Sequence, residues 1–138
     1  MYDSILEIMN PYDRVAGNLY IGGILPDYSE FDYVICCTPE CTHYNRTNKV
    51  THLVPFNDTR ELPPEQFITD VVELIILCAG KGKTLVQCSA GLNRSGMMVA
   101  LAMVKGGWYS TAAVAYLRTI RSQSVLHNET FLERVLLK

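Results

Sequence analysis

The sequence lacks long hydrophobic runs, a strong charge imbalance and internal repeats. Its longest apolar runs, 71–79 and 96–104, reach about half of the ~20 residues that a transmembrane helix needs. The net charge of −2 over 138 residues provides no general attraction to nucleic acid or to anionic lipid. Met1–Ser4 has no basic segment leading into an apolar core, so no secretory signal peptide is predicted. We therefore expect no membrane span.

The composition is typical of one globular domain, which we expect to span residues 1–138. Hydrophobic residues make up 49% of the chain and charged residues 19%. A chain of this length buries roughly two thirds of its surface on folding, enough for a single core. The cysteines number five, an odd count that does not suit a secreted disulfide framework. A reduced, intracellular and cytoplasmic setting is the prediction.

Strand and helix patterns alternate along the chain. Apolar or β-branched runs predict strands at 18–21, 33–37, 50–54 and 84–86. Helical spacing predicts helices from Pro63–Pro64 to Gly80, at 97–104, at 111–121 after an N-cap at Ser110, and at 129–137 after an N-cap at Asn128. Residues 1–14 are predicted to be irregular or a short helix, and residues 38–49 to be a loop, with a short helix as the alternative. This order predicts an α/β fold, with a central, mostly parallel sheet flanked by helices on both faces.

A short segment combines a cysteine, five residues, an arginine and a serine between a predicted strand and a predicted helix. Small residues leave the backbone N–H groups free to surround an anion, helped by the helix N-terminus. The expected phosphate-binding loop consists of Ser89, Ala90, Gly91, Leu92, Asn93 and Arg94. Cys88 at its floor is favoured as a thiolate nucleophile, Arg94 can grip two phosphoryl oxygens, and the Ser95 hydroxyl can assist the sulfur as leaving group.

Cys-x5-Arg-Ser resembles the signature loop of cysteine-dependent protein phosphatases, in particular the small dual-specificity branch. The resemblance implies a protein-tyrosine-phosphatase-like fold and a two-step reaction through a cysteinyl-phosphate. It implies no metal or cofactor, since Arg94 and the loop amides neutralise the phosphoryl charge. The family has histidine before the cysteine, where this chain has Gln87, which we expect to support the loop. Asn57-Asp58-Thr59 resembles the family segment whose aspartate protonates the leaving oxygen, so Asp58 is the expected general acid.

The predicted function is hydrolysis of phosphotyrosine and of phosphoserine or phosphothreonine in proteins, since so short a chain has little room for loops that deepen the pocket. One alternative is a polynucleotide 5′-phosphatase acting on RNA, because Gly-Leu-Asn-Arg-Ser-Gly resembles the Gly-x-Asn-Arg-Thr-Gly of that subfamily. The variable loop positions Ser89, Ala90, Leu92 and Asn93 carry no positive charge, and the chain is slightly acidic, which argues against RNA. The same neutral positions argue against inositol lipids. A second alternative is a weakly active module that binds phosphorylated partners, suggested by Gln87.

Other cysteines carry weaker signals. Cys37-x3-Cys41-x-His43 lacks the second ligand pair of a zinc site, so no metal is expected. Cys36 and Cys37 point to opposite faces of their strand, and core packing is the default expectation. The resemblance to lipid phosphatases in the family leaves open a disulfide between one of them and Cys88.

Two histidines and two aromatic residues receive no functional role from the sequence. His52 and His127 are predicted to be structural. Trp108 and Tyr109 follow a Gly-Gly turn and are predicted to pack on the core.

Overall fold

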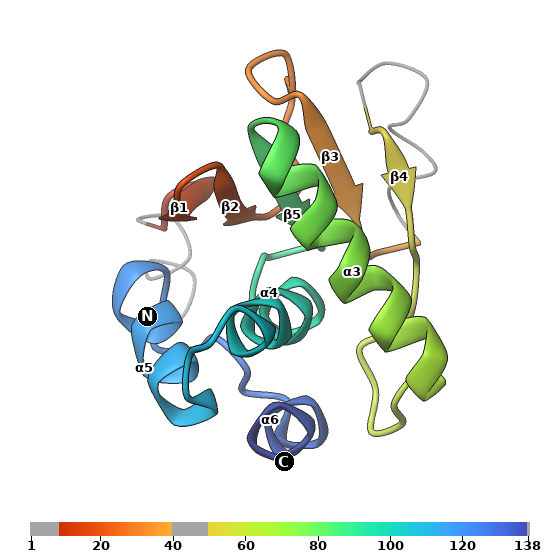
Figure 1. Ribbon diagram of the computed structural model, residues 1–138, viewed down its shortest axis with the longest axis vertical. Coiled ribbons are helices and arrows are strands. Elements are labelled where there is room, and N and C mark those ends of the chain that lie inside the picture. The colour runs from red at the N-terminus through yellow and green to blue at the C-terminus, as the bar shows by residue number, and fades with distance from the viewer. Residues whose placement is uncertain (1–8, 40–49, 138) are drawn as a thin grey trace.

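The computed structural model describes residues 9–39 and 50–137 (Figure 1), so the predicted loop at 38–49 lies almost wholly outside the described residues. The elements are β1 Tyr12–Ala16, β2 Leu19–Gly22, β3 Tyr33–Cys36, β4 His52–Leu53, α3 Glu65–Lys81, β5 Thr84–Gln87, α4 Arg94–Lys105, α5 Ser110–Ile120 and α6 Glu129–Leu136. No helix formed by these residues is long and apolar enough to cross a membrane.

The five strands form one sheet in the order β1-β2-β5-β3-β4. Only β1 pairs antiparallel; β2, β5, β3 and β4 run parallel to one another. In β5 all four residues are buried, as expected for a strand covered on both faces. The α/β fold and the mostly parallel sheet are therefore confirmed, and the segment that follows the central strand β5 leaves at the carboxyl edge of the sheet, where ligands bind in such folds.

The two faces of the sheet are covered differently. Ile35 and Val86 point into a large core that includes side chains from all four described helices. Their neighbours Val34 and Leu85 point to the opposite face, into a smaller cluster. That cluster is closed by Leu25, Tyr28 and Phe31 from the connection between β2 and β3. Among the described residues, this connection rather than a helix covers the second face.

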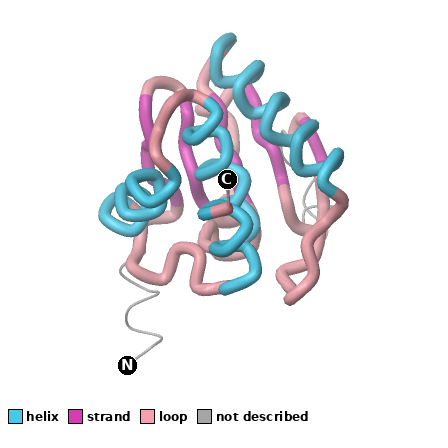
Figure 2. Tube along the Cα trace, turned by 60° about the horizontal axis from the view of Figure 1, so that its bottom comes forward, coloured by secondary structure: helices cyan, strands magenta, loops and turns pink. Residues whose placement is uncertain are grey.

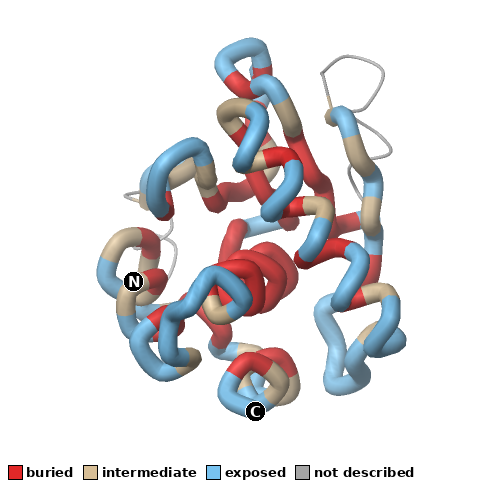
Figure 3. The backbone as a smooth tube through the Cα atoms, in the orientation of Figure 1, coloured by how far each residue is buried: buried red, intermediate tan, exposed pale blue. Residues whose placement is uncertain are grey.

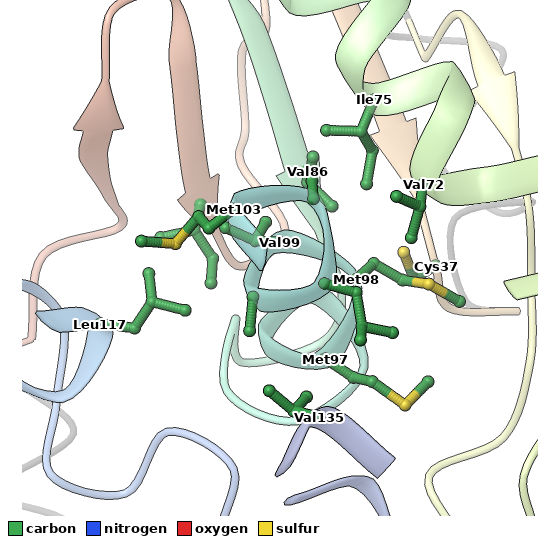
Figure 4. Close-up of a cluster of buried hydrophobic side chains, with 14 of the residues drawn as sticks. Cys37, Val72, Ile75, Val86, Met97, Met98, Val99, Met103, Leu117 and Val135 are labelled. Atoms are coloured by element: carbon green, nitrogen blue, oxygen red, sulfur yellow. The ribbon is translucent and has the colours of Figure 1, made fainter. Parts of the chain in front are cut away.

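Helix α4 lies at the centre of the large core. Every residue from Arg94 to Met103 is buried, and the tube is red throughout this stretch in Figure 3. Side chains from α3, α5, α6 and the sheet surround it, including Ile75, Leu117 and Val135 (Figure 4). The helix begins at Arg94, three residues earlier than predicted, so the loop that precedes it is anchored between a buried strand and a buried helix.

Strand β1 contradicts the prediction that residues 1–14 are irregular or helical. Its burial pattern leaves most of Tyr12–Ala16 partly or fully exposed, so the sequence carries little apolar periodicity. The strand exists because it pairs with β2 through a turn in which Gly17 has a φ of +53°. An edge strand of this kind is defined by its partner rather than by its own pattern.

The predicted strand at 50–54 is reduced to His52–Leu53. The Thr51 hydroxyl accepts a hydrogen bond from the Val34 N–H (2.9 Å) and donates to the Val34 carbonyl (3.1 Å). The backbone N–H of Thr51 also donates to the Val34 carbonyl (3.0 Å), so the side chain adds to a single backbone bond at the start of this strand. Loops and turns are pink in Figure 2, and the one that joins β4 to α3 carries Asp58.

Three predictions at helix ends are settled by the structure. Helix α3 continues past Gly80 to Lys81, and the N–H of Gly82 closes its last turn on the Cys78 carbonyl. Ser110 is the first residue of α5 rather than its N-cap. Asn128 is confirmed as the N-cap of α6, since its side chain accepts from the Phe131 N–H (3.2 Å).

The prediction that Trp108 and Tyr109 pack on the core is wrong for Tyr109, which is 83% exposed. Trp108 lies against the Tyr116 ring with the ring centroids 5.1 Å apart, and keeps 39% exposure. Both residues sit between α4 and α5, where the chain turns at the surface.

Candidate active site

Residues 88–94, hereafter the Cys88–Arg94 loop, connect β5 to α4. The Cys88 side chain is almost fully buried, and its Sγ lies 3.2 Å from the Ser95 Oγ. The structure therefore brings together the cysteine and the serine that the sequence singled out. A hydroxyl at this distance can donate to a sulfur anion, whichever atom carries the hydrogen in the resting protein.

Arg94 reaches back over the same loop. Its Nη2 donates to the Ser89 Oγ (3.2 Å), and its Nη1 donates to the Phe56 carbonyl (3.3 Å). Its Nε is buried and has no hydrogen-bond partner among the described residues. A buried guanidinium N–H left without an acceptor is unfavourable. This donor is therefore available to an anion bound in the loop.

The loop packs tightly against the end of β2. Gly91 has a φ of +72°, and a Cβ at this position would lie 2.5 Å from the backbone carbon of Gly22. A Cβ at Gly23 would meet the Ser89 carbonyl oxygen at 2.9 Å. Any side chain at Gly91 would therefore displace the backbone of the loop.

Arg121 supports the back of the loop, a role that sequence reasoning missed. Its Nη2 donates to the Ala90 carbonyl (3.0 Å), its Nε donates to the Gly91 carbonyl (3.3 Å), and its Nη1 pairs with Asp13 at 2.9 Å. In a trans peptide the next N–H points opposite to the carbonyl. The N–H groups of Gly91 and Leu92 are therefore directed away from Arg121, the orientation that an anion-binding loop requires.

A signal for Arg121 was present in the sequence. One face of α5 carries the buried Val114 and Leu117, and Arg121, the C-cap of the helix, continues that spacing. A charged residue at the next position of an apolar stripe is seldom buried without a partner. Its partner Asp13 lies in β1, the strand that the sequence did not predict.

Asp58 lies at the rim of the loop. Its Oδ2 accepts a hydrogen bond from the Asn93 Nδ2 (2.9 Å), and its Oδ1 accepts one from the Asn128 Nδ2 (2.6 Å). The structure therefore places Asp58 beside the Cys88–Arg94 loop through Asn93, a member of that loop. His127, which the sequence left without a role, contacts the same Asn93 side chain at 3.2 Å.

Gln87 is fully buried at the end of β5, directly before Cys88. It stands in register with Gly22 of β2 on one side and with Cys36 of β3 on the other. Its carbonyl accepts from the Cys37 N–H (2.8 Å). This position under the loop is compatible with the predicted supporting role.

The cysteines of β3 and its end behave differently from one another. Cys36 is disulfide-bonded, contrary to the expectation of reduced cysteines, whereas Cys37 and Cys88 are free thiols. Cys37 follows the residue in register with Gln87, so it lies beside Cys88. Burial raises the pKa of the Cys37 thiol well above its usual range, and the neighbouring Cys88 adds to the shift. Of the two candidates for a disulfide with Cys88, only Cys37 remains.

Within the described residues, no group of three or more His, Cys, Asp or Glu side chains gathers as metal ligands would. Cys41 and His43 of the discounted zinc pattern lie outside that part of the chain.

One comparison with known proteins identifies a family. Residues 25–138 match the family model described as dual specificity phosphatase, catalytic domain. No curated protein matches the chain.

Three solved structures illustrate the range of similar folds. The kinase associated phosphatase KAP, solved with its catalytic-site cysteine replaced by serine, has a TM-score of 0.71 and 13% identity, covering 92% of both chains. PTPMT1 in complex with PI(5)P has a TM-score of 0.65 and 18% identity, covering 91% of this chain and 97% of that one. The PP-IP phosphatase SIW14 of S. cerevisiae has a TM-score of 0.66 and 16% identity, covering 91% of this chain and 85% of that one. At these identities the likeness establishes the fold and not the substrate.

Proposed function

The chain belongs to the dual specificity phosphatase family, and on this premise we propose that it hydrolyses phosphotyrosine and phosphoserine or phosphothreonine in proteins through a cysteinyl-phosphate. The observation that carries the proposal is the buried Arg94 Nε without a partner among the described residues, in the same loop as the Cys88–Ser95 pair. A loop with an unused, buried cationic donor and directed amides suits a phosphoryl dianion.

In the first step, the phosphoryl group binds in the Cys88–Arg94 loop and the Cys88 sulfur attacks phosphorus. The bond from phosphorus to the leaving oxygen breaks, and Asp58 at the rim gives that oxygen a proton. Arg94 and the loop N–H groups stabilise the charge on the equatorial oxygens.

In the second step, a water molecule attacks the cysteinyl-phosphate, the sulfur–phosphorus bond breaks, and inorganic phosphate leaves. The Ser95 hydroxyl, 3.2 Å from the sulfur, stabilises the departing thiolate. Asp58, now ionised, accepts a proton from the water.

The charge of the loop supports this choice of substrate class. Ser89, Ala90, Leu92 and Asn93 carry no positive charge, so Arg94 is the one cation among residues 88–94. Polyanionic substrates such as RNA 5′-triphosphate, inositol pyrophosphates or PI(5)P gain most from several cations around the phosphate. A protein phosphomonoester needs only the one phosphoryl site, which favours it over the substrates named for PTPMT1 and SIW14.

The test is a substrate panel with Cys88→Ser as the matched control. Phosphate release would be measured from phosphotyrosine and phosphothreonine peptides, 5′-triphosphate RNA, an inositol pyrophosphate and PI(5)P in vesicles. We expect the phosphopeptides to be the best substrates, no turnover with Cys88→Ser, and phosphate binding by that variant in calorimetry. Preference for RNA or inositol phosphates would overturn the protein assignment, and turnover by Cys88→Ser would overturn the nucleophile.

A further inference from the structure

Four side chains from three separate segments form a closed polar network beside the Cys88–Arg94 loop. Asn93 Nδ2 donates both to Asp58 Oδ2 (2.9 Å) and toward His127 Nε2 (3.2 Å), and Asn93 Oδ1 accepts from the Asn128 N–H (3.0 Å). Asn128 Nδ2 donates to Asp58 Oδ1 (2.6 Å) and to the Thr59 carbonyl (2.9 Å). Every polar atom of the Asn93 amide is therefore used.

These contacts fix the direction of each hydrogen bond. The Asn128 N–H can only donate, so the Asn93 atom facing it must be the amide oxygen, and the Asn93 NH₂ faces Asp58 and His127. The Ser124 carbonyl, 2.8 Å from His127 Nδ1, can only accept, so Nδ1 carries the hydrogen. The His127 Nε2 is then the acceptor for the second Asn93 proton.

We propose that His127, as the neutral Nδ1–H tautomer, is a positioning residue for leaving-group protonation, acting on Asp58 through Asn93. This inference rests on the proposed function, in which Asp58 protonates the leaving oxygen. His127 touches neither Cys88 nor Arg94 in the hydrogen bonds of the structure, so its effect passes through the Asn93 amide.

Because Asn93 is buried, its second Nδ2 proton depends on His127 Nε2 as its hydrogen-bond acceptor. Asn93 is 5% exposed, so an Nδ2 proton that loses its acceptor has little access to water. The amide would turn or shift to find another acceptor, and the Asp58 carboxylate it holds would move with it. Cys88, Arg94 and Ser95 take no part in this network, so thiolate attack and phosphate binding would be spared.

The test compares two substitutions of His127, each of which keeps the hydrogen-bonding role of one ring nitrogen. His127→Gln places an amide oxygen where Nε2 lies and keeps the acceptor for Asn93. His127→Asn keeps a donor for the Ser124 carbonyl and removes the acceptor. Steady-state kcat/KM would be measured on phenyl phosphate, whose leaving group needs a proton, and on p-nitrophenyl phosphate, whose leaving group does not.

We expect His127→Asn to lose roughly 5- to 10-fold on phenyl phosphate, the lower part of the range for an unpaired buried donor. Loss on p-nitrophenyl phosphate should stay within about 2-fold, and His127→Gln should recover most of the phenyl phosphate rate. An equal loss on both substrates, or no recovery with His127→Gln, would overturn the proposal.

A second measurement does not depend on activity. Ring ¹⁵N chemical shifts of the wild-type protein, recorded well above the usual imidazole pKa of about 6.5, report which nitrogen carries the hydrogen. We expect Nδ1 of His127 to be protonated and Nε2 to be bare. An Nε2–H tautomer would overturn the network even in an active enzyme, whereas failure of wild-type hydrolysis on every substrate would instead overturn the proposed function.

Discussion

The Cys88–Arg94 loop is held from two sides that are built in opposite ways. At the back, the buried Arg121 binds backbone carbonyls of Ala90 and Gly91, and glycines allow backbone to touch backbone. At the rim, Asp58 and His127 are exposed and are joined through side-chain amides. The back sets the geometry of the anion site, which both chemical steps share. The rim orients one carboxyl group, so the loss of activity caused by a substitution there should depend on the leaving group of the substrate.

The largest effect is expected for Arg121→Met, which removes the support at the back of the loop. The substitution removes contacts with the carbonyls of Asn10, Ala90 and Gly91. It also leaves Asp13 without its cation, in a pair whose side chains are 1% and 12% exposed. Breaking such a buried pair costs about 3 kcal/mol or more. We expect a loss of this size in urea unfolding and a large loss of kcat/KM, equal for phenyl phosphate and p-nitrophenyl phosphate.

Arg118→Met is the matched control for Arg121→Met. Arg118 lies on α5 and binds the carbonyls of Val125 and Leu126 rather than those of the loop. It should lower stability with little change in kcat/KM at a temperature where the protein remains folded. If Arg121→Met lowered kcat/KM for only one of the two substrates, the claim that the back of the loop serves both chemical steps would be wrong.

The next effect comes from breaking the rim with Asp58→Asn. The amide cannot give a proton to the leaving oxygen, so kcat/KM for phenyl phosphate should fall by roughly 10²–10⁴. The p-nitrophenyl phosphate rate should change far less. Equal losses on both substrates would assign Asp58 to structure, through its bonds to Asn93 and Asn128, rather than to proton transfer.

Gln87→His tests a third position, which lies beneath the loop directly before Cys88 and belongs neither to the back nor to the rim. A protonated histidine would add positive charge near the Cys88 sulfur, whereas glutamine offers only uncharged hydrogen bonds. We expect iodoacetamide to alkylate Cys88 roughly tenfold faster at pH 6 in the variant, the lower end of the range for one opposite charge nearby. The length-matched Gln87→Met carries no charge and should not speed alkylation. An unchanged alkylation rate in Gln87→His would assign Gln87 a packing role and no electrostatic one.

The smallest effect in the absence of oxidant is expected for Cys37→Ala, which lies beside Cys88 but outside both supports. Its rate should match the wild type within about 2-fold. With mild peroxide, Cys88 sulfenic acid in the wild type should condense with the Cys37 thiol, with loss of water, to a disulfide that dithiothreitol reverses. Because burial raises the pKa of Cys37, it should not be the first site of oxidation.

Mass mapping after alkylation checks the Cys37 prediction. Irreversible sulfinic or sulfonic Cys88 should accumulate in Cys37→Ala and not in the wild type. The same overoxidised Cys88 in both proteins would exclude the disulfide.

Much of the fold could be predicted because its signals are local. The buried runs at 33–36 and 84–87 indicate parallel strands, and Asn128 indicates a helix cap, because each signal depends on neighbouring residues. Edge strand β1 and the two-residue β4 could not be predicted, because pairing partners elsewhere in the chain define them. The cover of the second sheet face was missed for the same reason: Tyr28 and Phe31 lie in a connection without periodicity.

The sequence alone determined the Cys88–Arg94 loop, because the strand, the cysteine, the small residues, the arginine and the helix occur within one short stretch whose spacing limits its shape. Only the tertiary structure decided what holds that loop. Arg121 lies 30 positions from Gly91 and 108 from Asp13, and His127 lies 34 positions from Asn93. Contacts between residues so far apart depend on how α5 and α6 pack around α4, and packing leaves no spacing in the sequence from which they could be predicted.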